Sequence, residues 1–196
     1  MPSDNRQLLK QRFPAILAML ESLPDDGSIL PLTARNGEPT LRVSRGNTGR
    51  LIHSGYDPAD EAARFVNALT LSPGSLPIVI GAGCGYHIDA LIDCRGPFDA
   101  MVIVEPDPAL FKKALAVRDF SRILSQPQLR LIVESDHNVL MKSLGAILQC
   151  DELKPRLKLI IHQPSLDVYR QSGSPFIDIL DKLHLGPRLQ AMSLGA

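Results

Sequence analysis

The sequence predicts an α/β protein in which a mostly parallel sheet carries helices on both faces, preceded by a small α+β segment. From residue 77 onward, short apolar runs alternate with stretches of helical periodicity, the pattern of strand-helix-strand units. Before that point, a helical apolar stripe is followed by a hairpin pattern. We therefore expect an N-terminal helical and hairpin subdomain over residues 1–76 and a nucleotide-binding-type domain over residues 77–196.

Two short helices, a hairpin and a third helix are expected in the first segment. Apolar residues recur at helical spacing over residues 6–23, and Pro14 should end one helix and begin the next. Residues 41–44 and 50–53 are predicted to pair as strands around a turn at 46–49. Asp57 is placed to cap a helix that Pro58 begins.

Four strands and four helices are expected in the second segment. The predicted strands cover residues 78–81, 100–105, 129–133 and 157–162. The predicted helices cover residues 86–94, 108–115, 138–149 and 175–183. Each interval between strands has room for one crossover helix, so the strands should be parallel and their ligands should bind beyond the carboxyl ends.

The overall composition is that of a globular protein. The 196 residues include 21 Lys and Arg against 21 Asp and Glu, and this neutral balance argues against nucleic acid as a partner. Hydrophobic residues make up 44% of the chain, enough for a sizeable core, yet no apolar run is long enough to cross a membrane. We expect a soluble, cytoplasmic protein without a membrane partner.

A glycine-rich turn between the first predicted parallel strand and its helix is the most informative segment. Residues 81–86 read Gly81, Ala82, Gly83, Cys84, Gly85 and Tyr86. Glycine at alternate positions allows a tight turn and a close approach of the backbone to a ligand. A dinucleotide fingerprint would need glycine where Tyr86 stands, and no Gly-Lys-Ser/Thr follows, which disfavours NAD, FAD and ATP.

The G-x-G-x-G spacing is similar to the opening of S-adenosylmethionine-dependent methyltransferases, which implies a Rossmann-like fold of the methyltransferase type. Glu105 ends the second strand, where a carboxylate can accept hydrogen bonds from ribose hydroxyls, and Asp136 follows the third strand, where such enzymes often contact the base. The acidic residue usual two positions before the first glycine is replaced by Val79. The candidate cofactor-binding residues are Gly81, Ala82, Gly83, Cys84, Gly85, Tyr86, Glu105, Asp107 and Asp136.

Each of these residues also has a structural interpretation. The glycine turn can reflect tight packing alone, and Asp107 and Asp136 are each placed to cap the helix that follows. The histidines lie in different segments without i, i+4 spacing, and the three cysteines form no C-x-x-C pair, so no metal site is predicted. Without a Ser-His-Asp order or an adjacent carboxylate pair, no catalytic residue can be assigned.

Several motifs together resemble the N-terminal domain of motility-associated factor (Maf) proteins, the Maf-type flagellin glycosyltransferases. They are HSGYDP at 53–58, GAGCGYH at 81–87, IVEPDP at 103–108 and LKQRFP at 9–14. The resemblance implies a Rossmann-like domain that precedes a separate transferase domain using a CMP-activated nonulosonic acid. The Gly-Pro-Ser-Leu motif that opens that transferase domain is missing, since residues 163–166 read QPSL.

Three functional hypotheses follow. The first is a Maf-like domain in flagellin or protein glycosylation that binds a nucleotide such as CMP or acts as a scaffold, with a transferase domain or another protein as partner. The second is an S-adenosylmethionine-dependent methyltransferase acting on a small molecule. The third is a non-enzymatic interaction module whose cleft is vestigial and whose exposed sheet edge makes the contact.

Overall fold

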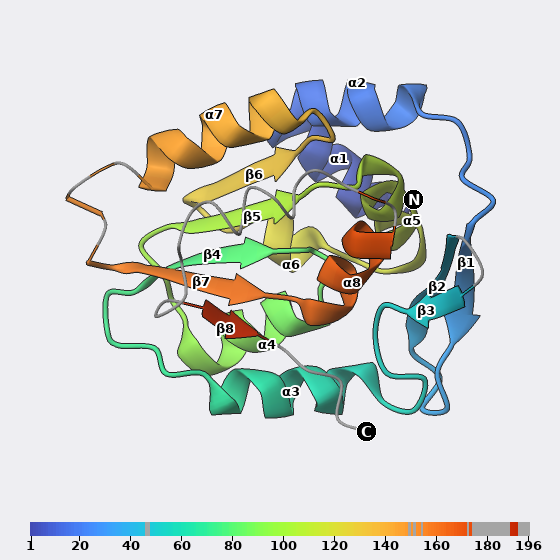
Figure 1. Ribbon diagram of the computed structural model, residues 1–196, viewed down its shortest axis with the longest axis horizontal. Helices are drawn as coiled ribbons and strands as arrows, with labels where there is room; N and C mark the ends of the chain where they lie inside the picture. The colour runs from blue at the N-terminus through green and yellow to red at the C-terminus, as the bar shows by residue number, and fades with distance from the viewer. Residues whose placement is uncertain are drawn as a thin grey trace.

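The computed structural model describes residues 1–45, 48–148, 150, 152–153, 155–171, 173 and 189–191, and it contains two sheets (Figure 1). A three-stranded antiparallel sheet has the order β1-β2-β3, and a five-stranded parallel sheet has the order β6-β5-β4-β7-β8. The α/β class predicted from the sequence is therefore confirmed. Every helix within the described ranges is too short or too polar to span a bilayer.

In the first part of the chain, helices come before and after the small sheet in sequence order. Its elements are α1 (Ser3–Arg12), α2 (Pro14–Ser22), β1 (Ile29–Thr33), β2 (Pro39–Arg45), β3 (Thr48–Leu51) and α3 (Pro58–Ala68). Pro14 occupies the first position of α2, and the Asp57 carboxylate accepts a hydrogen bond from the Asp60 amide at the start of α3. The break at Pro14 and the cap of α3 are as predicted. The hairpin is present, but its second strand covers Thr48–Leu51 instead of residues 50–53, and β1 was not predicted.

The parallel sheet contains the four predicted strands and a fifth. Its elements are β4 (Leu76–Ile80), α4 (Tyr86–Arg95), β5 (Met101–Glu105), α5 (Pro108–Val117), α6 (Ser121–Leu124), β6 (Leu129–Val133), α7 (His137–Leu148), β7 (Leu157–Ile161), α8 (Gln163–Gln171) and β8 (Leu189–Ala191). The first and fourth predicted strands each end one residue later than β4 and β7 do. Neither α6, α8 nor β8 was predicted, and the helix predicted at 175–183 lies outside the described residues.

Alternate residues of each parallel strand face opposite layers of helices, as the two-residue period of a strand requires. Val79 and Ile103 pack into one apolar cluster with α3, α4, α5 and α6. Ile80 and Val104 pack into a second cluster with α7 and α8 on the other face. Figure 1 shows the small antiparallel sheet beside the ends toward which the β4, β5 and β7 arrows point.

One apolar cluster includes residues from both sides of residue 76. Ile29, Leu41 and Ile52 belong to the same cluster as Val79 and Ile103. The division into residues 1–76 and 77–196 therefore stays a prediction from the change in sequence pattern. What matters for function is that the small antiparallel sheet lies at the carboxyl edge of the parallel sheet (Figure 1).

Candidate functional site at the carboxyl edge of the sheet

The glycine turn predicted between β4 and α4 is present, and its three glycines have positive φ angles, which glycine adopts more readily than other residues. Gly81, Gly83 and Gly85 have φ values of 87°, 49° and 81°. A side chain at any of them would be strained, because L residues rarely occupy positive φ. Gly85 is the residue immediately before the first helical residue of α4.

Most amide donors of this turn are already bonded within the protein. The Gly81 amide donates to Val104 O at 2.8 Å, and the Ala82 amide donates to Glu105 Oε2 at 2.9 Å. The Cys84 amide donates to His53 Nε2 at 3.1 Å, and the Gly85 amide donates to Ala82 O at 2.8 Å. A phosphate-binding turn would leave such donors free for its ligand.

Protein side chains also fill the space that the glycines leave open. A Cβ atom added at Gly81 would lie 2.7 Å from the Cβ of Ser165, and one added at Gly83 would lie 2.7 Å from His53 Nε2. At Gly85 the added atom would lie 3.0 Å from the ring of Phe120. The close approach that the glycines permit is thus an approach by the protein's own residues.

Glu105 lies at the end of β5, as predicted, but it is fully buried and its carboxylate is bonded within the protein. Oε2 accepts from the Ala82 amide, while Oε1 accepts from the Asp107 amide at 2.9 Å and from the hydroxyl of Tyr169. Burial raises the pKa of this carboxyl from 4.5 to about 7. Both oxygens that a ribose would use therefore already have donors.

The remaining acidic candidates cap helices. Asp107 accepts from the Leu110 amide at 3.0 Å and forms an ion pair with Arg45, with 2.5 Å between Nη1 and Oδ2. Asp136 is exposed and accepts from the Asn138 and Val139 amides at the start of α7. Hydrogen bonds connect Ala82, Glu105 and Asp107 into one group, whereas the Asp136 carboxylate bonds amides of its own helix.

Tyr86 and Cys84 are buried beneath the first segment. The Tyr86 hydroxyl donates to Pro39 O in β2 at 2.8 Å, and the Arg118 guanidinium lies 4.1 Å from the centre of the Tyr86 ring. Burial raises the pKa of the Cys84 thiol to about 12, so this cysteine is a neutral core residue rather than a reactive thiolate. The small antiparallel sheet thereby covers the glycine turn.

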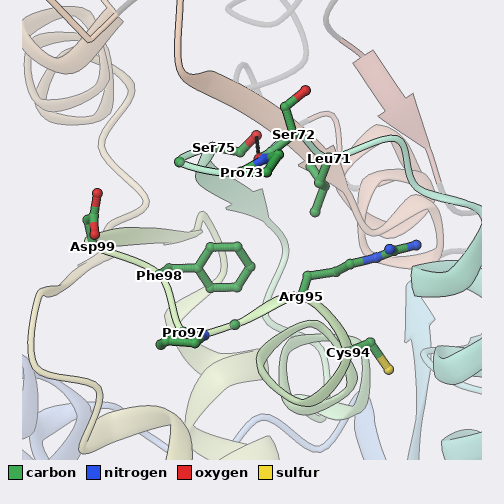
Figure 2. Close-up of a pocket in the computed structure, with 11 residues that line it drawn as sticks. Leu71, Ser72, Pro73, Ser75, Cys94, Arg95, Pro97, Phe98 and Asp99 are labelled. Carbon is green, nitrogen blue, oxygen red and sulfur yellow. Dashed lines mark hydrogen bonds between the residues drawn. The ribbon is translucent and has the colours of Figure 1, made fainter.

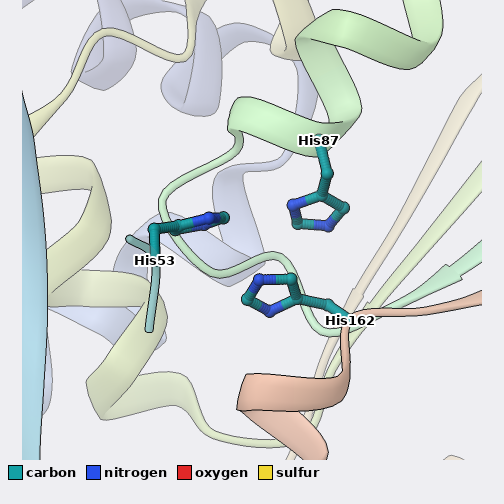
Figure 3. A group of neighbouring side chains, drawn as sticks. All are labelled: His53, His87 and His162. Atoms are coloured by element: carbon teal, nitrogen blue, oxygen red, sulfur yellow. The ribbon is translucent and has the colours of Figure 1, made fainter. Parts of the chain in front are cut away.

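Three buried histidines meet beside Gly83, and the sequence analysis did not predict their meeting. His53 follows β3, His87 is the second residue of α4, and His162 follows β7 (Figure 3). One nitrogen of each ring lies within 4.8 Å of the corresponding nitrogens of the other two. Burial lowers the pKa of all three imidazoles, and for His87 and His162 the neighbouring rings lower it further, so the cluster is neutral at pH 7.

A separate pocket of about 390 Å³ lies at the opposite, amino-terminal edge of the sheet. Residues 71–75 before β4 and residues 94–99 before β5 line it, and the Phe98 ring projects into it (Figure 2). Open α/β sheets bind their ligands at the carboxyl ends of the strands. We therefore take the carboxyl edge, with the glycine turn, Glu105 and the histidine cluster, as the candidate site.

Comparison with known proteins finds a family that matches the middle of this chain. Residues 56–152 match the family described as "Glycosyltransferase Maf N-terminal domain". An uncharacterized protein of Treponema pallidum (strain Nichols) is 29% identical over 143 residues, which cover 66% of this chain and 46% of that relative. The chain thus spans about half the length of this curated relative.

The fold is also similar to that of a solved Maf structure. The structure of the Maf glycosyltransferase from Magnetospirillum magneticum AMB-1 aligns with a TM-score of 0.59 at 12% identity, over 88% of this chain and 34% of that protein. At this identity the likeness concerns the fold alone. The family match covers the glycine turn and Glu105, two of the features that suggested the resemblance. Residues 56–152 thus match the family of Maf glycosyltransferase N-terminal domains, and the resemblance that the sequence motifs suggested is confirmed.

Proposed function

We propose that this chain is a scaffold domain of the Maf glycosylation machinery, and that its glycine turn serves the fold instead of binding a nucleotide. The observation that carries the proposal is the Glu105 carboxylate, which is buried and accepts hydrogen bonds from Ala82, Asp107 and Tyr169. To bind a ribose, this carboxylate would have to give up donors that hold three segments together. Losing such partners in a buried site is costly.

The bonding of the turn supports the same proposal. Four of its amides have protein acceptors, and the space above Gly81 and Gly83 is taken by Ser165 and His53. A nucleotide would therefore have to displace the first segment and α8. The methyltransferase alternative would need the same opening, and it also has Val79 where an acidic residue would hold the amino group of S-adenosylmethionine.

In this role the domain would position a transferase domain that moves a CMP-activated nonulosonic acid onto flagellin. The resemblance assigns the transfer step to that separate domain. Residues 163–166 are the part of this chain most similar to the motif that opens the transferase domain. They form the first turn of α8, where Pro164, Ser165 and Leu166 are buried. Burial of this turn favours a packing role for it.

Calorimetric titration of the purified chain tests the proposal directly. We expect no binding heat with CMP or with S-adenosylhomocysteine. A micromolar Kd for CMP, about −8 kcal/mol, would contradict the scaffold role in favour of a nucleotide-sugar role. A micromolar Kd for S-adenosylhomocysteine, lost in Glu105→Ala, would favour the methyltransferase instead.

A second experiment tests the glycosylation role. Deleting the gene in the source organism should reduce the intact mass of flagellin by the mass of its sugars, and a plasmid copy should restore it. A copy carrying Glu21→Gln, an exposed carboxylate with 49% of its side chain accessible, is the matched control and should restore it equally. Unchanged flagellin mass after deletion would contradict the role.

A further inference from the structure

The three histidines beside Gly83 are arranged as metal ligands are, with one ring nitrogen held from outside and the other directed inward. His53 Nδ1 faces the Glu61 carboxylate, 3.5 Å from Oε2, without a hydrogen bond to it. His87 Nε2 lies 3.0 Å from Gly81 O, and His162 Nδ1 lies 2.7 Å from Ser165 Oγ. Outer partners of these kinds, a carboxylate, a carbonyl and a hydroxyl, orient the imidazoles of metal sites.

Two of the three inward nitrogens have no hydrogen-bond partner: His87 Nδ1 and His162 Nε2 are buried and make no hydrogen bond. The third, His53 Nε2, accepts from the Cys84 amide, and a bound ion would have to replace that donor. Because Gly81 O can only accept, Nε2 of His87 carries the hydrogen, and Nδ1 of the neutral ring is a bare lone pair. A buried polar atom without a partner is costly, and a bound cation would remove that cost.

Gly83 leaves room for this meeting of rings. An added Cβ at this position would lie 2.7 Å from His53 Nε2 and 2.9 Å from His162 Cε1. The rings of His87 and His162 are stacked, with centroids 4.4 Å apart and planes 5° from parallel. Since a metal lies in the plane of each imidazole that binds it, at least one of these two rings must turn on binding.

The distances set the size of that movement. Nitrogens bound to tetrahedral zinc at 2.0–2.1 Å lie roughly 3.3 Å from one another. The three nitrogens here lie within 4.8 Å, so they must approach by up to about 1.5 Å. Rotation about the side-chain torsions of His87 and His162 supplies movements of this size, and the neutral rings need no deprotonation.

We propose that His53, His87 and His162 form a binding site for a divalent transition-metal ion, with Zn²⁺ the expected occupant. Imidazole is a preferred ligand of zinc, and three histidines leave a fourth position for water. The Glu61 carboxylate beside His53 supplies a negative charge toward the ion. The metal would tie together the first segment, the start of α4 and the end of β7. This site is independent of the scaffold proposal, because it requires neither a nucleotide nor a transferase domain.

The test uses the full chain, purified without a histidine tag and stripped of metal with a chelator. Elemental analysis after reloading should give one zinc per chain. The Tm should rise by about 5–10 °C when free Zn²⁺ reaches 100 times Kd. A Tm that does not respond to Zn²⁺ would overturn the proposal.

Two substitutions remove one inward nitrogen each and keep the outer contact. His87→Gln retains an N–H donor for Gly81 O but lacks Nδ1, and His162→Asn retains a polar atom beside Ser165 but lacks Nε2. Both should weaken zinc binding by roughly 100-fold and abolish the rise in Tm. His137→Gln, at the start of α7 and outside the cluster, is the matched control and should retain both. Equal responses of all three variants would overturn the assignment.

X-ray absorption of the zinc-loaded wild-type chain decides the matter if either variant fails to fold. Three imidazole nitrogens at about 2.0–2.1 Å are expected. A spectrum with sulfur ligands or with fewer than three imidazoles would overturn the proposal. This measurement requires no substituted protein.

Discussion

The hydroxyl of Tyr169 donates a hydrogen bond to Oε1 of Glu105, and this contact links α8 to the end of β5. The other oxygen of the same carboxylate accepts from Ala82, directly after β4. Glu105 thus joins segments that follow or end three neighbouring strands, β5, β4 and β7. A carboxylate with this many donors acts as a cross-link at the carboxyl edge of the sheet.

Replacing Glu105 by Gln should destabilise the chain. The amide nitrogen of Gln would face the N–H of Ala82 or the donors on the other side, because one end of the side chain can no longer accept. The free energy of unfolding should fall by about 1–3 kcal/mol at pH 5, where the folded wild type holds a proton on Glu105, and by less at pH 7, measured by urea denaturation. Glu21→Gln, on the exposed surface of α2, should change it by less than about 0.5 kcal/mol. Equal effects of the two substitutions would contradict the cross-link.

The titration of Glu105 should appear in the pH dependence of stability. Burial raises its pKa from 4.5 to about 7, the Asp107 carboxylate adds to the rise, and the Tyr169 hydroxyl opposes it. The folded chain therefore holds a proton that the unfolded chain releases between pH 4.5 and 7. Stability from this group falls as pH rises through that window, by roughly 3 kcal/mol in total, and levels off above it.

The difference between wild type and Glu105→Gln isolates this effect. The buried histidines, whose pKa values are lowered, contribute stability that rises with pH, so the wild-type curve alone mixes two slopes of opposite sign. Urea denaturation from pH 4 to 8 should show the advantage of the wild type shrinking as pH rises. A constant difference would show that the pKa of Glu105 is not raised by folding.

Gly83→Ala should destabilise the chain strongly. Its φ of 49° costs an L residue about 1 kcal/mol, and the added Cβ would overlap His53 Nε2. We expect a loss of about 2–4 kcal/mol in the free energy of unfolding. Gly145→Ala in α7 is the control: an added Cβ there meets nothing within 4 Å, and stability should rise by about 0.5–1 kcal/mol. Thermal and urea unfolding of both variants provide the comparison.

The two helix-capping aspartates should differ in importance. Asp107→Ala removes the cap of α5 and leaves Arg45 without one of its carboxylate partners, whereas Asp57→Ala removes only the cap of α3. We expect losses of about 2–3 kcal/mol and about 1 kcal/mol respectively, from urea denaturation. A loss for Asp57→Ala as large as that for Asp107→Ala would mean that the ion pair with Arg45 adds nothing.

Local signals in the sequence were enough to predict much of the fold. Asp57-Pro58 and Asp107-Pro108 each place a cap before a proline, and both helices begin there. The four buried parallel strands are short apolar runs, so their positions were predicted within two residues. In contrast, β1 carries exposed Leu30 and Leu32 around a proline, and it lacks the alternation that marks a half-buried strand.

The candidate site was only partly predictable, because its contacts depend on elements that the sequence did not reveal. Glu105 was correctly expected at a strand end, but its partner Tyr169 lies in α8, which was not predicted. The three histidines follow or begin elements far apart in the chain, so no spacing rule could bring them together. Their proximity requires the pairing of β4 with β7 and the packing of β3 beside the glycine turn.

The apolar cluster that contains both Ile29 and Val79 has a consequence for how the chain unfolds. Detaching the first segment would expose apolar side chains of this shared cluster, and it would also remove the covering of the glycine turn. Neither part can then open without destabilising the other, so the chain should behave cooperatively, as one thermodynamic unit. The boundary at residue 76 marks a change in sequence pattern, while the energetic unit extends across it.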